Sequence, residues 1–143
     1  MEAFGSRLAQ ATTQGAVIFL QGELGAGKTT LVRGFVRALG YAGRVKSPTY
    51  TLLESYRLEG VNLYHLDLYR LADAEELEWI GIRDLLEDAD LCLIEWPDRG
   101  LGVLPPADLE IQIEYRGEGR ALQLLPSSDR GRDIVRRLHD PQV

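Results

Sequence analysis

Residues 16–40 read "AVIFLQGELGAGKTTLVRGFVRALG", which joins an apolar segment, a glycine-rich turn and an amphipathic segment. The apolar run 16–21 is short and β-rich, and it predicts a buried strand. Apolar residues recur at helical spacing from Leu31 to Leu39, and Gly40 is a natural helix stop. The order of strand, glycine-rich turn and helix is the context in which phosphate-binding loops occur.

The turn itself, "GELGAGKTT" at 22–30, matches G-x-x-x-x-G-K-[ST] through Gly22, Gly27, Lys28 and Thr29. Glycines allow consecutive backbone N–H groups to curl around an anion. We expect Lys28 to reach the β- and γ-phosphates of a nucleotide, and the Thr29 hydroxyl to bind Mg²⁺. The alternative is a flexible glycine turn without a ligand, and the flanking strand and helix favour phosphate binding.

Lysine is scarce in this chain, where only Lys28 and Lys46 occur among sixteen basic residues. A genome-wide bias toward arginine explains such a ratio. Lys28 stands where a compact ammonium fits better than a forked guanidinium. We interpret Lys46, which precedes "SPTYT", as functional, with a plain solvated base as the alternative.

Composition sets the limits on the class of protein. With 143 residues, the chain predicts a single domain, residues 1–143. The net charge of −6 disfavours direct, strong binding to nucleic acid. Cys92 has no second cysteine to pair with, and neither a signal peptide nor a membrane-spanning stretch is visible. We therefore expect a cytoplasmic protein that does not bind a membrane.

The rest of the chain alternates between strand and helix patterns and predicts an α/β fold. This is a P-loop NTPase-like domain with a mixed parallel/antiparallel central sheet flanked by helices. Expected helices cover 2–11, two short segments within 72–89 broken near Gly81, and 127–139 capped by Ser128 or Asp129. Expected strands cover 49–56 and 61–68 as one hairpin, 91–96, and 108–115 and 121–126 as a second hairpin.

Two acidic residues stand at the ends of hydrophobic runs. "NLYHLD" ends in Asp67 and "LCLIE" ends in Glu95, positions typical of carboxylates beside a nucleotide-bound metal. One acid would hold Mg²⁺ or its water shell, and the other would orient the attacking water. The alternative is that both simply end strands in solvent. Thr49, in the Pro-stiffened loop "KSPTYT", could place a hydroxyl near a γ-phosphate, although a turn leading into a strand is the competing interpretation.

Several motifs in this order closely resemble the bacterial TsaE family. They are "GELGAGKTT", "VKSPTYTL", "YHLDLYRL", "EELEWIGIRDLL" and "LCLIEWPDRG". The resemblance runs from about residue 15 to about residue 125. It implies a small ATPase required for synthesis of threonylcarbamoyladenosine in tRNA, working with the TsaB and TsaD proteins. The tRNA would be met only through that complex, whose transfer cycle ATP hydrolysis resets or sustains.

The resemblance also assigns residues. Gly25, Ala26, Gly27, Lys28, Thr29 and Thr30 match the family's nucleotide-phosphate residues. Thr29 and Glu95 match its magnesium residues, Asp67 its other site acid, and Thr49 its switch-like loop. Arg120, just past a hairpin turn, matches a nucleotide-contacting arginine, and Trp96 is the aromatic residue that follows the acid. The implied cofactors are ATP or ADP and Mg²⁺, and the implied catalytic residues are Lys28, Glu95, Asp67 and Thr49.

Other classes remain as alternatives. A GTPase would need Asn-Lys-x-Asp, and the only asparagine, Asn62, is followed by Leu63. A small-molecule kinase would need a lid and an acceptor site, which a short chain could hide. A nucleotide-dependent assembly factor with negligible turnover is a third class. The arginines of the last helix, Arg130, Arg132, Arg136 and Arg137, suggest either a solvated face or a basic patch for a partner.

Overall fold

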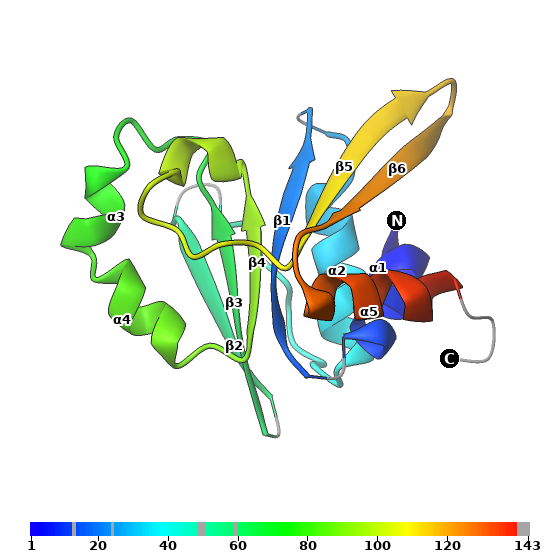
Figure 1. The fold of residues 1–143 in the computed structure, drawn as a ribbon, viewed down its shortest axis with the longest axis horizontal. Helices are drawn as coiled ribbons and strands as arrows, with labels where there is room; N and C mark the ends of the chain where they lie inside the picture. The colour runs from blue at the N-terminus through cyan, green and yellow to red at the C-terminus, as the bar shows by residue number, and fades with distance from the viewer. Residues whose placement is uncertain (13, 24, 49–50, 59, 140–143) are drawn as a thin grey trace.

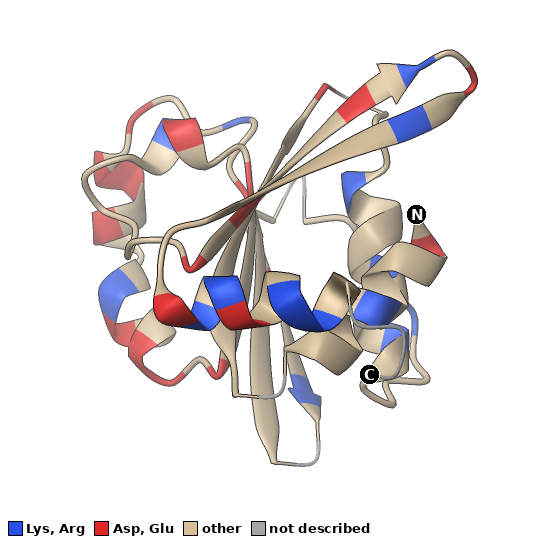
Figure 2. Ribbon diagram, turned by 45° about the vertical axis from the view of Figure 1, so that its right-hand side comes forward, with Lys and Arg blue, Asp and Glu red and all other residues tan. Residues whose placement is uncertain are grey.

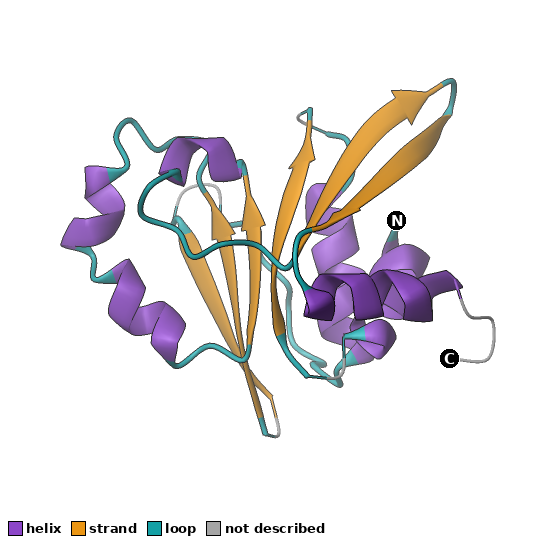
Figure 3. Cartoon of the chain, in the orientation of Figure 1, coloured by secondary structure: helices purple, strands orange, loops and turns teal. Residues whose placement is uncertain are grey.

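The computed structural model describes residues 1–12, 14–23, 25–48, 51–58 and 60–139. A six-stranded sheet forms the centre of the molecule, with helices on both of its faces (Figure 1, Figure 3). Its helices are α1 (Glu2–Ala11), α2 (Lys28–Ala38), α3 (Glu75–Trp79), α4 (Ile82–Glu87), the 3₁₀ helix η1 (Pro97–Gly100) and α5 (Asp129–His139). Its strands are β1 (Ala16–Gly22), β2 (Leu53–Leu58), β3 (Val61–Asp67), β4 (Leu91–Glu95), β5 (Leu109–Arg116) and β6 (Gly119–Pro126).

The strands lie in the order β2-β3-β4-β1-β5-β6. The four central strands are parallel, whereas β2 and β6 are antiparallel edge strands joined to their neighbours as hairpins. The prediction of an α/β fold with a mixed sheet flanked by helices is confirmed. Because the central strands are parallel, the carboxyl ends of β3, β4 and β1 meet at one edge of the sheet.

Alternation along β1 divides the core between the two faces of the sheet. Ile18 and Leu20 belong to the cluster that α1, α2 and α5 cover, whereas Val17 and Phe19 belong to the cluster beneath α3 and α4. Cys92 lies in the second cluster, where burial raises the pKa of its thiol to about 12. The thiol therefore serves as part of the core rather than as a nucleophile.

The helices α1 and α2 approach each other closely enough to need glycine at the contact. A Cβ atom on Gly34 would lie 2.1 Å from the carbonyl oxygen of Glu2, which no real side chain tolerates. The close contact fixes α2 against α1, and through α2 it fixes the turn that precedes Lys28.

In both hairpins the strand boundaries differ from those that the sequence predicts. We expected a strand over 49–56, but β2 begins only at Leu53, since Leu52 has a positive φ of 72° that breaks the extended backbone. In the second hairpin, Arg116 pairs with Gly119, so that only two residues make the turn and Arg120 lies within β6. The two short helices expected within 72–89 are confirmed, with Gly81 between them.

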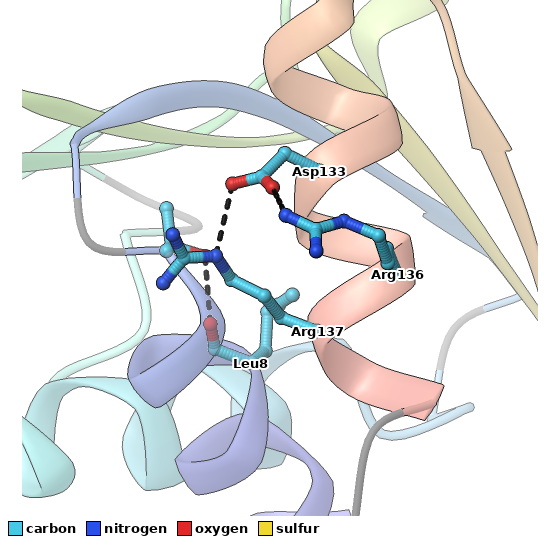
Figure 4. A network of polar contacts seen from close by, with 5 residues as sticks. Leu8, Asp133, Arg136 and Arg137 are labelled. Atoms are coloured by element: carbon cyan, nitrogen blue, oxygen red, sulfur yellow. Dashed lines mark hydrogen bonds and ion pairs between the residues drawn. The ribbon is translucent and has the colours of Figure 1, made fainter.

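The C-terminal helix α5 begins at a serine cap, in which Ser128 Oγ accepts a hydrogen bond of 3.0 Å from Gly131 N. Three of its arginines pair with carboxylates of the same helix. Arg132 bonds to Asp129, while Arg136 and Arg137 both bond to Asp133 (Figure 4). This pairing favours a solvated helix face over a basic patch. In the described part of the chain, no helix is long and apolar enough to cross a membrane.

Candidate functional site

The turn after β1 leads directly into α2, and within it Ala26 N donates to Glu23 O at 3.0 Å. Gly25 and Gly27 have positive φ angles of 79° and 112°, which let the chain curl between the strand and α2. Leu31 N donates to Gly27 O at 2.9 Å, so this first helical hydrogen bond leaves the amides of Lys28, Thr29 and Thr30 without helical partners. These amides lie at the positive end of the α2 dipole, an arrangement suited to binding an anion.

Lys28 is buried, with only 4% of its surface exposed, although it is the first residue of α2. Its Nζ donates a hydrogen bond to Gly22 O and lies 3.9 Å from the centroid of the Trp96 ring. Burial lowers the pKa of Lys28 below its ordinary value, and the nearby carboxylates of Glu95 and Asp67 oppose this effect. The ammonium is therefore held inside the turn, between a carbonyl group, an aromatic ring and two acids.

The two predicted acids lie side by side at the same edge. Asp67 is aligned with Glu95 in the β3–β4 ladder, and Glu95 is aligned with Leu20 in the β4–β1 ladder. Both are buried, with 5% of Asp67 and 2% of Glu95 exposed, so the alternative that they end strands in solvent is wrong. Asp67 Oδ1 accepts a hydrogen bond of 3.0 Å from Tyr69 N, which fixes the orientation of its carboxylate.

His65 is a site residue that sequence reasoning missed. The ring is fully buried, and its Nε2 lies 2.6 Å from Glu95 Oε2. The buried Nδ1 atom has no hydrogen-bond partner among the described residues. An ionised carboxylate only accepts hydrogen bonds, so Nε2 carries the hydrogen that it donates to Glu95 Oε2. His65 thus holds Glu95 through one of its two oxygens. The alternation of side chains along a strand could have revealed it, because His65 precedes Asp67 by two residues and therefore lies on the same face of β3.

Trp96 follows Glu95 in a left-handed backbone conformation, with φ of 56°. This conformation is uncommon for a bulky residue and costs roughly 1–3 kcal/mol, so the surrounding structure must enforce it. Its ring contacts Tyr69 at a centroid distance of 5.1 Å and lies next to the Lys28 ammonium. The strained turn places the indole ring under the glycine-rich turn.

Arg120 reaches the glycine-rich turn from β6. Its Nε donates to Ala26 O at 2.9 Å, and its guanidinium lies 4.0 Å from the centroid of Tyr115. A groove of about 550 Å³ runs beside the turn, which is within the size range of small-molecule sites. Its lining includes Gly22, Glu23, Trp96 and Tyr115.

Of the remaining predicted residues, the structure describes Thr29, Thr30 and Lys46 but not Thr49. Thr29 and Thr30 lie in the first turn of α2. Thr49 lies outside the described residues. Leu52, which the structure describes, contacts one of the acids, since Asp67 N donates to Leu52 O at 3.1 Å. Lys46 is exposed in the loop before β2.

No three His, Cys, Asp or Glu side chains of the described residues cluster to form a metal cage. The oxygen atoms of Thr29 and Glu95 still fit Mg²⁺, because this ion typically takes one or two protein oxygens together with phosphate and water. A hydroxyl at Thr29 and a free carboxylate oxygen on Glu95 would be enough.

A parallel sheet with a glycine-rich turn between β1 and α2, and with acids at the neighbouring strand ends, defines a P-loop-type α/β protein. The crystal structure of Bacillus subtilis YdiB shares this architecture, with a TM-score of 0.79, 29% sequence identity, and alignment over 96% of this chain and 85% of that chain.

Residues 1–122 match the family model described as "Threonylcarbamoyl adenosine biosynthesis protein TsaE". The Haemophilus influenzae tRNA threonylcarbamoyladenosine biosynthesis protein TsaE is 46% identical over 94% of this chain and 89% of its own length. A Bacillus subtilis protein of the same name is 39% identical over 73% of this chain and 65% of its own. The chain belongs to the TsaE family.

Proposed function

We propose that this protein is a Mg²⁺-dependent ATPase that serves the TsaB–TsaD complex in the modification of tRNA to threonylcarbamoyladenosine. The observation that carries the proposal is that phosphate-binding groups and carboxylates lie together at one edge of the sheet. The turn of β1 supplies open backbone amides and a buried lysine, while β3 and β4 supply two buried carboxylates. Phosphoryl transfer needs this combination of phosphate binding, metal binding and water positioning.

Phosphate binding falls to the residues from Gly25 to Thr30. The amides of the α2 first turn would bind phosphate oxygens, and the Lys28 ammonium would move from Gly22 O to the β- and γ-phosphates. Arg120 would add a second positive charge from the hairpin, where it already contacts Ala26. The groove beside the turn offers space for the nucleoside.

The acids divide the remaining work. Thr29 and Glu95 would hold Mg²⁺, which when bound neutralises charge on the phosphates. His65 occupies one Glu95 oxygen and leaves the other for the metal or its water. Asp67 would orient the attacking water, and its carboxylate is already held by the Tyr69 amide. Thr49 would add a hydroxyl from the loop that ends against Asp67.

Hydrolysis in this chain would act on partners rather than on a substrate of its own. The γ-phosphate would hold the Thr49 loop in one state, and its release would change the affinity for TsaB–TsaD. The tRNA would be met through the complex, in keeping with the net charge of −6. A cytoplasmic location fits this role.

The test is steady-state phosphate release from ATP and from GTP, with and without Mg²⁺ and purified TsaB–TsaD. We expect slow, Mg²⁺-dependent release from ATP that rises when the complex is added. Binding without turnover under all conditions would favour an assembly factor. Transfer of phosphate to a metabolite instead of water would identify a kinase.

A further inference from the structure

The negative charge of this protein is concentrated in one part of the fold. Residues 73–90, which contain α3 and α4 and are called the acidic arm here, hold eight carboxylates and a single basic residue, Arg83. The rest of the chain holds fourteen acidic and fifteen basic residues, so it is nearly neutral. All eight carboxylates of the arm are exposed, and Figure 2 shows them along α3, α4 and their connecting loops.

An exposed aromatic residue stands in the middle of the acidic arm. Trp79 is 82% exposed and Ile80 is 46% exposed, at the junction between α3 and α4. Their neighbours Leu77 and Ile82 are fully buried and attach the arm to the core cluster on that face. The fold therefore uses the flanking residues for packing and leaves the tryptophan in water.

An exposed tryptophan keeps a large apolar surface in water, and with 82% of its surface exposed Trp79 adds little packing to this fold. Tryptophan is, with tyrosine and arginine, enriched among interface hot spots, where an aromatic side chain enters a pocket on the partner. A surrounding ring of charge then sets partner choice and association rate. Nucleic acid and anionic membranes would be repelled by eight carboxylates.

We propose that the acidic arm is a docking surface for a protein with basic side chains around an apolar pocket that accepts Trp79. The charge of the arm selects the basic partner, and the indole ring supplies most of the contact energy. The inference rests on the proposed function for its choice of probe, the TsaB–TsaD complex. It adds to that function the surface through which this chain would bind.

The experiment is a calorimetric titration of the full chain with TsaB–TsaD at low and high salt, comparing Trp79→Ala with Leu101→Ala. Leu101 is a matched control, because it is also large, apolar and 65% exposed but lies outside the acidic arm. We expect Trp79→Ala to weaken binding about 30-fold or more, the size of a hot-spot loss. Leu101→Ala should bind within about twofold of the unsubstituted chain. Higher salt should also weaken the binding of the unsubstituted chain to TsaB–TsaD, because salt screens the charges of the acidic arm.

Basal phosphate release should be the same in both variants, which separates docking from the nucleotide site. Equal affinities of the two variants would overturn the inference while leaving the proposed function standing. If the unsubstituted chain shows basal ATP hydrolysis yet no affinity for TsaB–TsaD, the proposed partnership fails and this docking assignment fails with it. Binding of tRNA alone that depends on Trp79 would also contradict a protein partner.

Discussion

The turn after β1 and the ends of β3 and β4 meet at one edge of the sheet, yet they offer opposite chemistry. The turn presents backbone N–H groups and Lys28, and its shape depends on glycines and on the tight packing of α1 against α2. The strand ends present Asp67 and Glu95, whose positions depend on ladder register and on a buried histidine. The turn therefore depends on local backbone conformation and on one helix–helix contact, whereas the acid pair depends on the pairing of strands that are distant in sequence.

This difference separates binding from turnover. A nucleoside diphosphate such as ADP would contact mainly the turn, so residues of the turn should have the largest effect on nucleotide affinity. Positioned water and metal matter most as the bond to the γ-phosphate breaks, so the acids should dominate rate. Variants on the two sides should therefore fail in different ways.

The largest effect is expected for Lys28→Ala, which removes the one charged residue in the sequence from Gly25 to Thr30. We expect both phosphate release and nucleotide binding to fall, with turnover lowered about 100-fold or more. The matched control is Arg37→Ala, which removes an exposed positive charge from the last turn of the same helix, α2. Phosphate release and calorimetric affinity give the measurement, with circular dichroism to verify the fold. Unchanged turnover in Lys28→Ala would refute the assignment of the turn.

The next effect separates the two sides directly. Glu95→Gln keeps the shape and an acceptor for His65 but removes the negative charge, so turnover should fall about 100-fold while ADP affinity changes by only a few-fold. Single-turnover rates and ADP titrations measure the two quantities in the same sample. If Glu95→Gln hydrolyses ATP normally and Asp67→Asn does not, the roles of the two acids are the reverse of those proposed.

A smaller effect is expected for His65, a positioning residue that would act through Glu95. His65→Ala leaves a buried carboxylate without its partner, so the free energy of unfolding should fall by about 1–3 kcal/mol. We expect kcat to fall about tenfold with KM nearly unchanged. His65→Gln, whose amide can still donate a hydrogen bond, should recover part of kcat. If His65→Ala and His65→Gln have equal kcat values, the hydrogen bond to Glu95 does not affect catalysis, and His65 has only a structural role.

The smallest effect concerns the C-terminal helix. Charge reversal at Arg132 and Arg136 breaks two surface ion pairs within α5, and because such exposed pairs contribute little, stability should change only slightly. Basal hydrolysis and its stimulation by TsaB–TsaD should not change. Loss of stimulation alone, with normal basal hydrolysis, would restore the hypothesis of a basic docking patch.

The same contrast explains what the sequence could predict. The turn could be found because its glycines, lysine and threonine are consecutive and its flanking strand and helix have clear periods. Asp67 and Glu95 could be proposed as strand ends, but nothing local shows that β3 pairs with β4 and brings His65 to Glu95. The left-handed backbone at Leu52 and Trp96 could not be predicted either, since tertiary contacts enforce it against local preference. The nucleotide contact expected of Arg120 rests on the family resemblance alone, because a hairpin residue carries no such signal of its own.

The most direct test is single-turnover cleavage of ATP labelled at the γ-phosphate, with the protein in excess over the nucleotide and TsaB–TsaD present. The site described here predicts that bound ATP becomes ADP and free phosphate, that the conversion requires Mg²⁺, and that Glu95→Gln retains the nucleotide but leaves it intact. Bound ATP that stays intact in the unsubstituted protein, or label that moves to an acceptor other than water, would contradict the central claim that this edge of the sheet hydrolyses ATP.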